Sequence, residues 1–360
     1  MIVGRLSRLR DFLREKKADA VVVNKEVNLH YFSGFRGDDS LLLVSPDDAL
    51  LVTDSRYTEQ AAEQAPLFEV IEQKDGLWAK AAECAKAHGW KKLAFEGNAM
   101  LYDTFVKFGE RLEKKAALDV PVHLDKLREV KEAEEIACIR KACEIGDAAF
   151  LDIVKFIRPG ISEQEVAAQL EMTMRSLGAE RPAFATIVAS GERGSLPHGI
   201  ATEKLIVSGE FVTMDFGAVY EGYHSDMTRT VCVGPASGEQ RALYGTVLDA
   251  QEFGVSLVKP GVPGKEVDGL VRQRISAAGY GKNFGHGLGH SLGLEIHEEP
   301  RLSAKSDCES LLPGMLVTVE PGVYLPGKCG LRIEDTVLVT ETGGERLTKS
   351  SKELMEILQL

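Results

Sequence analysis

The sequence of 360 residues has few cysteines, no basic run and no long apolar run. Its six cysteines are scattered and none forms a C-x-x-C pair, so they indicate reduced thiols and not a cysteine-based zinc site. The formal net charge is −12 and Lys and Arg do not cluster, which argues against nucleic-acid binding because that needs a basic face. No stretch approaches about 18 uninterrupted apolar residues, so no membrane-spanning helix is predicted.

The N-terminal segment also lacks the apolar stretch of a signal peptide. Leu6, Leu9, Phe12 and Leu13 recur at helical spacing between charged residues, which predicts an amphipathic helix. We therefore expect a cytoplasmic protein that binds neither membranes nor nucleic acids.

Hydrophobic residues make up 44% of the chain, enough for a large core, and the length favours two domains. Residues 1–124 alternate strand patterns with helical patterns and predict a small α/β domain. A long charged helical pattern begins at residue 125 and opens the second domain, residues 125–360. Within the first domain, strands are expected at residues 18–24, at 40–54 with a turn at 45–48, and at 91–97, and helices at 77–88 and 100–115.

The second domain contains an internal repeat. The segment "FIRPGISEQEV" (156–166) aligns with "LVKPGVPGKEV" (257–267) at an offset of 101 residues. Farther on, "VTMDFG" (212–217) aligns with "VTVEPG" (317–322), and "SDMTRTV" (225–231) with "IEDTVLV" (333–339). This self-similarity predicts two half-domains that pack about a pseudo-two-fold axis.

Carboxylates occupy matched positions of the repeat, because Asp215 aligns with Glu320 and Asp226 with Glu334. The segments around them have the apolar, β-branched composition of buried strands, with a hairpin turn at residues 220–222. An unpaired buried carboxylate is costly, so a cationic partner is expected nearby. Arg229 and Arg332 are candidates, but two arginines cannot neutralise four acids. A pair of divalent cations explains the pattern better.

Three of the eight histidines lie in "GHGLGHSLGLEIHEEP" (285–300), at positions 286, 290 and 297. A site with several carboxylates and one imidazole suits Mn²⁺, Co²⁺, Fe²⁺ or Zn²⁺. It does not match the H-E-x-x-H zinc motif, because Pro300 stands where the second histidine would be.

Four segments together resemble the aminopeptidase P / prolidase (Xaa-Pro peptidase) family of pita-bread metallopeptidases, which is related to creatinase and methionine aminopeptidase. They are "MDFGAVYEGYHSDMTRT", "GHGLGHSLGLEIHEEP", "VTVEPGVY" and "LRIEDTV". The first half is similar to the creatinase/prolidase N-terminal domain, with weaker motifs such as "VNLHYFSGFRGDDS" (27–40). The resemblance implies an α/β (α+β) architecture: a small N-terminal domain followed by a pita-bread domain.

The resemblance also implies the residues of a two-metal site. The metal ligands would be Asp215, Asp226, His290, Glu320 and Glu334. Asp226 and Glu334 match the carboxylates that bridge the two metals. The cofactors would be two divalent ions, Mn²⁺ or Co²⁺ first, with Zn²⁺ and Fe²⁺ as alternatives. His224 shares a strand face with Asp226, but the family's ligand set is complete without it.

Further site residues follow from the same motifs. Glu320 matches the family's proton shuttle, in addition to its role as a ligand. The other residues that match catalytic positions are His198 (in "LPHG"), His286, His297, Tyr324 and Arg332. Arg332 lies two residues before Glu334, on the same strand face, so it would orient that carboxylate or the substrate.

The implied activity is metal-dependent hydrolysis of the Xaa-Pro bond in a peptide with proline at the second position. The motifs fit an Xaa-Pro aminopeptidase and a dipeptidase (prolidase) equally well. A methionine aminopeptidase-like activity and a non-catalytic pita-bread binding protein are the alternatives. The resemblance implies a homodimer assembled partly through the N-terminal domain, which contains no catalytic cluster of its own.

Overall fold

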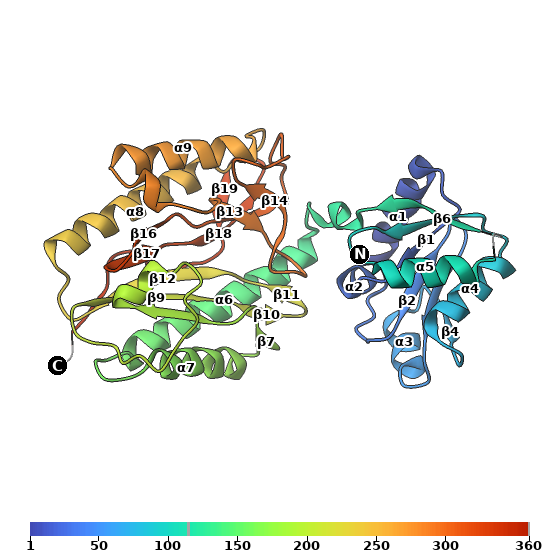
Figure 1. Cartoon of the computed structure of the whole chain (residues 1–360), viewed down its shortest axis with the longest axis horizontal. Helices are drawn as coiled ribbons and strands as arrows, with labels where there is room; N and C mark the ends of the chain where they lie inside the picture. Colours follow the sequence, from blue (N-terminus) through green and yellow to red (C-terminus); the bar gives the residue numbers. More distant parts are fainter. Residues whose placement is uncertain (114–115, 359–360) are drawn as a thin grey trace. The chain divides into compact units, whose positions relative to one another are not determined.

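The computed structural model describes residues 1–113 and 116–358, which divide into two units (Figure 1). The first unit is Met1–Arg128 and the second is Glu129–Leu360. No helix in the two described ranges is long and apolar enough to cross a membrane.

The division lies four residues beyond the boundary expected after residue 124. The cause is the short 3₁₀ helix η1 (Leu124–Arg128), which is bonded to the first unit. The Asp125 carboxylate accepts hydrogen bonds of 3.0 Å from Lys25 Nζ and from Asn28 Nδ2. These bonds hold the connecting segment to the start of α2 (Glu26–Ser33) in the first unit.

The first unit contains a six-stranded sheet in the order β4-β3-β2-β1-β5-β6. Strand β1 pairs antiparallel with β2 and parallel with β5, so the sheet is mixed. The four strands expected from the sequence are present, including the hairpin around residues 45–48. Strands β4 and β6 were not expected, because several of their residues are exposed and carry little apolar signal. The strands are β1 (Ala20–Val23), β2 (Leu41–Val44), β3 (Ala49–Thr53), β4 (Glu69–Glu72), β5 (Lys92–Glu96) and β6 (Ala117–Val122).

Helices cover this sheet. Ala81, Ala85 and Phe108 of α4 and α5 pack with Val22 and Leu43 of the sheet in one buried cluster. The helix predicted at 77–88 is α4; the one predicted at 100–115 is the shorter α5, and residues 114 and 115 lie outside the described residues. The helices are α1 (Ile2–Lys16), α2 (Glu26–Ser33), α3 (Thr58–Gln64), α4 (Leu77–Ala87) and α5 (Tyr102–Arg111).

The second unit consists of two similar halves, as the repeat predicted. Its four long helices are α6 (Ala133–Phe156), α7 (Glu163–Ser176), α8 (Gly238–Leu257) and α9 (Gly264–Ala277). Helix α8 ends 101 residues after the end of α6, and α9 begins and ends 101 residues after α7 does. In Figure 1 the pair α6 and α7 lies on one side of the strands, and the pair α8 and α9 on the other. Each pair packs with strands in a separate buried cluster, and the cluster around α8 and α9 also includes Phe211 and Cys232 of the first half.

The strands of this unit form several small sheets between the helix pairs. The largest has the order β20-β12-β9-β8, and a three-stranded sheet has the order β15-β18-β19. The strands are β7 (Arg181–Pro182), β8 (Ile187–Ser190), β9 (Glu210–Phe216), β10 (Ala218–Tyr220), β11 (Tyr223–His224), β12 (Met227–Val233), β13 (Gly289–Ser291), β14 (Glu298–Leu302), β15 (Leu316–Val319), β16 (Gly322–Leu325), β17 (Cys329–Arg332), β18 (Asp335–Val339), β19 (Gly344–Arg346) and β20 (Glu356–Ile357). Two 3₁₀ helices, η2 (Gly191–Ser195) and η3 (Gly281–Asn283), connect them.

The strand registers of the two halves differ by two residues. Thr228 of β12 pairs with Asp215 of β9. Its counterpart Thr336 pairs with Thr318, two residues before the counterpart of Asp215. Because side chains alternate with a period of two, such a shift keeps each carboxylate on the same face of its strand.

Helix α6 begins later than the charged pattern suggested. It starts at Ala133 and not at residue 125, because Glu132 and Glu135 form a capping box. In that box the Glu135 carboxylate accepts a 3.0 Å hydrogen bond from the Glu132 N–H. The segment before the cap is therefore not part of α6. It places Lys131 in the interior of the second unit, where it is buried.

Candidate metal centre

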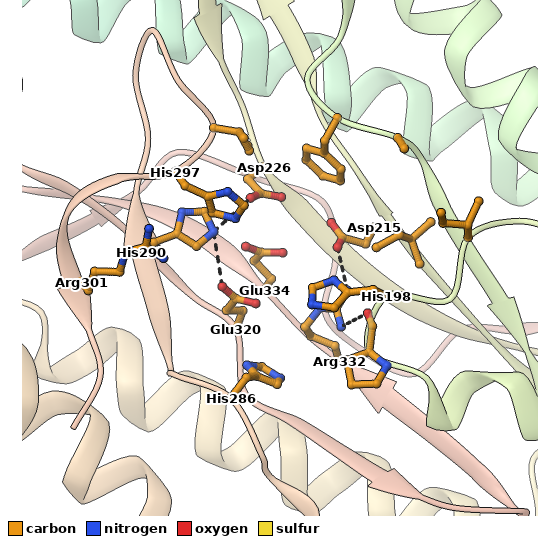
Figure 2. Close-up of a pocket in the computed structure, with 16 residues that line it drawn as sticks. His198, Asp215, Asp226, His286, His290, His297, Arg301, Glu320, Arg332 and Glu334 are labelled. Carbon is orange, nitrogen blue, oxygen red and sulfur yellow. Dashed lines mark hydrogen bonds and ion pairs between the residues drawn. The ribbon is translucent and has the colours of Figure 1, made fainter. Parts of the chain in front are cut away.

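The five predicted ligands come from five different segments of the second unit and converge on one cavity of about 430 Å³ (Figure 2). Asp215 is the penultimate residue of β9 and His290 is the centre of β13. Asp226 and Glu334 immediately precede β12 and β18, and Glu320 immediately follows β15. The matched repeat positions therefore place two carboxylates from each half on the same cavity.

The ligand atoms form two overlapping groups. One carboxylate oxygen from each of Asp215, Asp226 and Glu334 lies within 4.8 Å of the other two. His290 Nε2 lies 3.6 Å from Asp226 Oδ2 and 3.5 Å from Glu320 Oε1. Asp226 belongs to both groups, which is the position that a bridging carboxylate would occupy.

Burial makes this cluster electrostatically unfavourable without a cation. Burial, together with the neighbouring carboxylates of Glu334 and Asp215, raises the pKa of Asp226 well above its usual range. Burial likewise raises the pKa of Glu334, and it raises the pKa of Glu320 to about 7. Within the described residues, Asp215 Oδ1 and Glu334 Oε1 are buried and accept no hydrogen bond. Such oxygen atoms fit divalent metal ions, which accept carboxylate and imidazole ligands.

His290 is oriented for coordination through one nitrogen. Its Nδ1–H donates to the Ser291 carbonyl oxygen at 3.0 Å, so the Nε2 lone pair faces the carboxylates. Burial lowers the pKa of His290 to about 3, which keeps the imidazole neutral. A neutral imidazole fixed by such a bond is the usual form of a histidine ligand.

Arg332 lines the same cavity and is linked to two of the carboxylates, directly to one and through a threonine hydroxyl to the other. Its Nη2 donates to Asp215 Oδ2 at 2.6 Å. Its Nε donates to Thr228 Oγ1 at 3.0 Å, and that hydroxyl donates to Glu334 Oε2 at 2.6 Å. The expected action of Arg332 on Glu334 therefore passes through Thr228.

Arg229 does not serve as a counter-ion for the four acids. Its Nη2 donates to Asp335 Oδ1 at 2.8 Å, and both side chains are buried. Its Nη1 donates to the backbone carbonyl of Glu334 and not to the carboxylate. Of the two arginines considered from the sequence, only Arg332 therefore pairs with a site carboxylate.

His286 and Tyr324 extend this network away from the carboxylates. Arg332 Nη1 donates to the Tyr324 hydroxyl at 2.8 Å, and that hydroxyl lies 2.9 Å from His286 Nε2. His286 Nδ1 donates to the Gly287 carbonyl, so Nε2 accepts the tyrosine proton. His286 lines the cavity, whereas Tyr324 lines an adjoining one together with His286 and His198.

His198 and His297 line the same cavity from its exposed side. The ring centroids of His297 and His290 are 4.4 Å apart. Figure 2 shows His297 beside His290, and His198 on the side of Asp215 and Arg332. The two accessible imidazoles thus lie on either side of the carboxylates, at the exposed part of the cavity.

His224 is not among the described residues that line this cavity. Its Nδ1 donates to the Gly293 carbonyl oxygen at 3.0 Å, and its Nε2 lies 3.5 Å from Arg181 Nη2. His224 ends β11 whereas Asp226 precedes β12, so the strand alternation does not carry over from one to the other.

Several residues in or next to the site were not predicted. Thr228 and Thr318 each lie two residues from a predicted ligand, and Thr318 Oγ1 donates to Glu320 Oε1 at 3.2 Å. The same period-two argument that selected Arg332 could have found both. Arg301 and the apolar side of the cavity carry no local signal; the apolar residues are Phe184, Ala185, Ile187, Pro197, Ile200 and Ile296.

Comparison with known proteins agrees with the motifs. Residues 137–341 match Metallopeptidase family M24, and residues 5–130 match the Creatinase/Prolidase N-terminal domain. The Xaa-Pro dipeptidase of Pyrococcus furiosus is 42% identical over 353 residues, which cover 98% of this chain and 99% of that protein. The solved structure of an Xaa-Pro dipeptidase from Bacillus anthracis has a TM-score of 0.94 and 43% identity, with 99% of both chains covered. An X-Pro aminopeptidase from Thermotoga maritima has a TM-score of 0.90 and 40% identity, with 98% of this chain and 99% of that chain covered.

The matches extend over nearly the whole chain and include both units. They confirm the predicted fold class: a creatinase/prolidase-like first unit and a pita-bread second unit. The chain therefore belongs to metallopeptidase family M24.

Proposed function

We propose that Asp215, Asp226, His290, Glu320 and Glu334 bind two divalent metal ions, Mn²⁺ or Co²⁺ in the first place. The observation that carries this proposal is the convergence of two buried carboxylates, two half-buried carboxylates and one neutral imidazole on a single cavity. Arg332 pairs with only one of the four acids. When bound, such ions supply Lewis acidity and activate water at neutral pH.

The reaction that this site fits best is hydrolysis of an Xaa-Pro peptide bond. Glu320 would accept the proton of the attacking water and return it to the leaving nitrogen, because its carboxylate borders the cavity beside His290. His198 and His297 would donate hydrogen bonds to the charge that develops on the scissile carbonyl oxygen. The apolar side of the cavity, which includes Phe184 and Ile187, would hold apolar parts of the substrate such as the prolyl ring.

Dipeptides are the first choice of substrate. The Pyrococcus furiosus and Bacillus anthracis relatives are both named Xaa-Pro dipeptidases. Longer Xaa-Pro-Xaa peptides are the second choice, because the Thermotoga maritima relative is named an X-Pro aminopeptidase. Comparison of Ala-Pro with Ala-Pro-Ala as substrates separates the two activities.

The enzyme should hydrolyse Ala-Pro with a kcat/KM at least about tenfold above that for Ala-Ala, since one well-packed ring supplies about 1.4 kcal/mol of transition-state binding. Steady-state assays with the Mn²⁺-loaded protein measure this ratio. Equal kcat/KM values for Met-Ala-Ser and Met-Pro-Ser would instead favour a methionine aminopeptidase. An inactive protein that still binds metal would favour a binding role.

We also propose a homodimer formed partly through the N-terminal unit. Light scattering at micromolar concentration should then give twice the 39.3 kDa mass of one chain. A particle with the mass of a single chain would rule this assembly out.

A further inference from the structure

The segment between the proposed ligand His290 and the site residue His297 is held by a buried ammonium group. We call residues 290–297 the histidine loop. Lys131 Nζ donates to Ser291 Oγ at 3.2 Å and to Glu298 Oε2 at 3.0 Å, and the Lys131 side chain is only 1% exposed. Ser291 follows His290 and Glu298 follows His297. One ammonium group therefore binds next to both histidines.

The Glu298 carboxylate fills the interior of this loop. Its other oxygen accepts a hydrogen bond of 3.1 Å from the Glu295 N–H. A Cβ atom added at Gly293 would lie 2.9 Å and 3.0 Å from the two carboxylate oxygens, so the loop backbone is packed directly against them. Lys131 places a buried positive charge 3.0 Å from this buried carboxylate.

His224 holds the same loop from the opposite side. Its backbone N–H donates to the Gly293 carbonyl oxygen at 2.8 Å, and its Nδ1–H donates to the same oxygen at 3.0 Å. Gly293 is therefore held between His224 and the Glu298 carboxylate. This contact gives a role to the one buried histidine that the proposed metal site does not use.

We propose that Lys131, Glu298 and His224 are positioning residues, which fix the histidine loop so that His290 and His297 face the carboxylates. The inference rests on the proposed metal site. None of the three side chains lines the cavity among the described residues, so each would act through the loop. A misplacement of about 1 Å at a catalytic group lowers rates by as much as about 100-fold, so the loop contacts are large enough to matter.

Lys131→Met and Glu298→Gln test the proposal. Each should lower kcat on Ala-Pro by about 10- to 100-fold while KM changes by less than about twofold. Each should also alter the visible absorption spectrum of the protein loaded with Co²⁺ alone, because the spectrum reports the ligand geometry of His290. The double variant should be no worse than the poorer single variant, since the two residues form one pair. His224→Ala should have a smaller effect, because its backbone N–H still binds Gly293.

Val166→Ala provides the control. Val166 of α7 is buried in the hydrophobic cluster formed by α6, α7 and neighbouring strands. This variant should lower the melting temperature because it leaves a cavity there, and it does not change the histidine loop. Its Co²⁺ spectrum and kcat should match those of the parent. The proposal is overturned if Lys131→Met and Glu298→Gln lose stability as Val166→Ala does but keep the parent's spectrum and kcat. Should Lys131→Met fail to fold, Glu298→Gln decides by the same two readouts.

The spectrum also separates this inference from the proposed function. If the parent protein cleaves no Xaa-Pro peptide but the Co²⁺ spectrum changes in Glu298→Gln, the substrate assignment is wrong and the positioning role stands. If the parent protein cleaves Xaa-Pro peptides but all three positioning variants keep its spectrum and kcat, the proposed function stands and the positioning role is wrong.

Discussion

EDTA should lower the rate of Ala-Pro hydrolysis by about 10³-fold or more, and added Mn²⁺ or Co²⁺ should restore it. Without a divalent cation, the site retains Arg332 beside Asp215 but no Lewis acid to activate water at neutral pH. Addition of EDTA together with a molar excess of Mn²⁺ controls for direct effects of the chelator. Full activity after verified removal of metal would end the metallopeptidase account of this site.

Chelation should also lower the melting temperature, because it leaves like charges facing one another in a buried cavity. A cation at about 1,000 times its Kd stabilises the folded state by about 4 kcal/mol if it binds only that state. For a unit of this size, that corresponds to a shift on the order of 10 °C. Calorimetric scans at several Mn²⁺ concentrations measure it. A melting temperature independent of Mn²⁺ would mean that the carboxylate cluster does not bind the ion.

His290→Ala should lower kcat/KM by more than about 100-fold and reduce the bound metal from two ions to about one per chain. The estimate follows from groups that only orient a metal ligand. Their loss alone lowers metal affinity or activity by about 10- to 100-fold. His290 is the one imidazole within 3.6 Å of two site carboxylates among the described residues, so its removal opens one coordination position. Elemental analysis of the purified variant measures the metal content.

His224→Ala is the matched control, because His224 is also buried and lies two residues from Asp226. Its metal content should stay near that of the parent, since His224 is no ligand and its backbone N–H still holds the Gly293 carbonyl oxygen in the variant. The assignment of the histidine ligand is wrong if His224→Ala loses metal while His290→Ala retains it.

The carboxylates could be located from the sequence because they sit at matched positions of an internal repeat. Each lies at or next to the end of a strand, and a two-residue difference in register between the halves preserves the facing side. None of the four positions requires knowledge of a contact between segments far apart in the chain. A local pattern was therefore enough to bring Asp215, Asp226, Glu320 and Glu334 together.

Contacts between segments far apart in the chain could not be predicted in this way. Lys131 and Glu298 are separated by 167 positions, and neither carries a motif that points to the other. The partner of Arg229 was likewise missed: it is Asp335, directly beside the predicted ligand Glu334. The alternation of side chains along a strand predicts which of them share a face. It does not predict which charged group of another segment lies against that face.

Strand breaks and helix caps account for the remaining differences. Arg332 and Glu334 both reach Thr228 Oγ1 although β17 ends at Arg332 and β18 begins only after Glu334, so strand alternation does not explain why the two side chains share a side. A break of the same kind separates His224, which ends β11, from Asp226, and there the side chains diverge, because His224 Nδ1 binds the Gly293 carbonyl oxygen. The charged pattern that begins at residue 125 contains a helix that starts only at Ala133, because the capping box fixes its first turn.

Titration of the metal-free protein with Mn²⁺, followed by calorimetry, tests the two-metal centre most directly. The arrangement of Asp226 between the Asp215–Glu334 pair and the His290–Glu320 pair predicts two bound ions per chain. A stoichiometry of two, lowered to about one by His290→Ala, is the expected result. A stoichiometry of one or none in the parent protein would contradict the account.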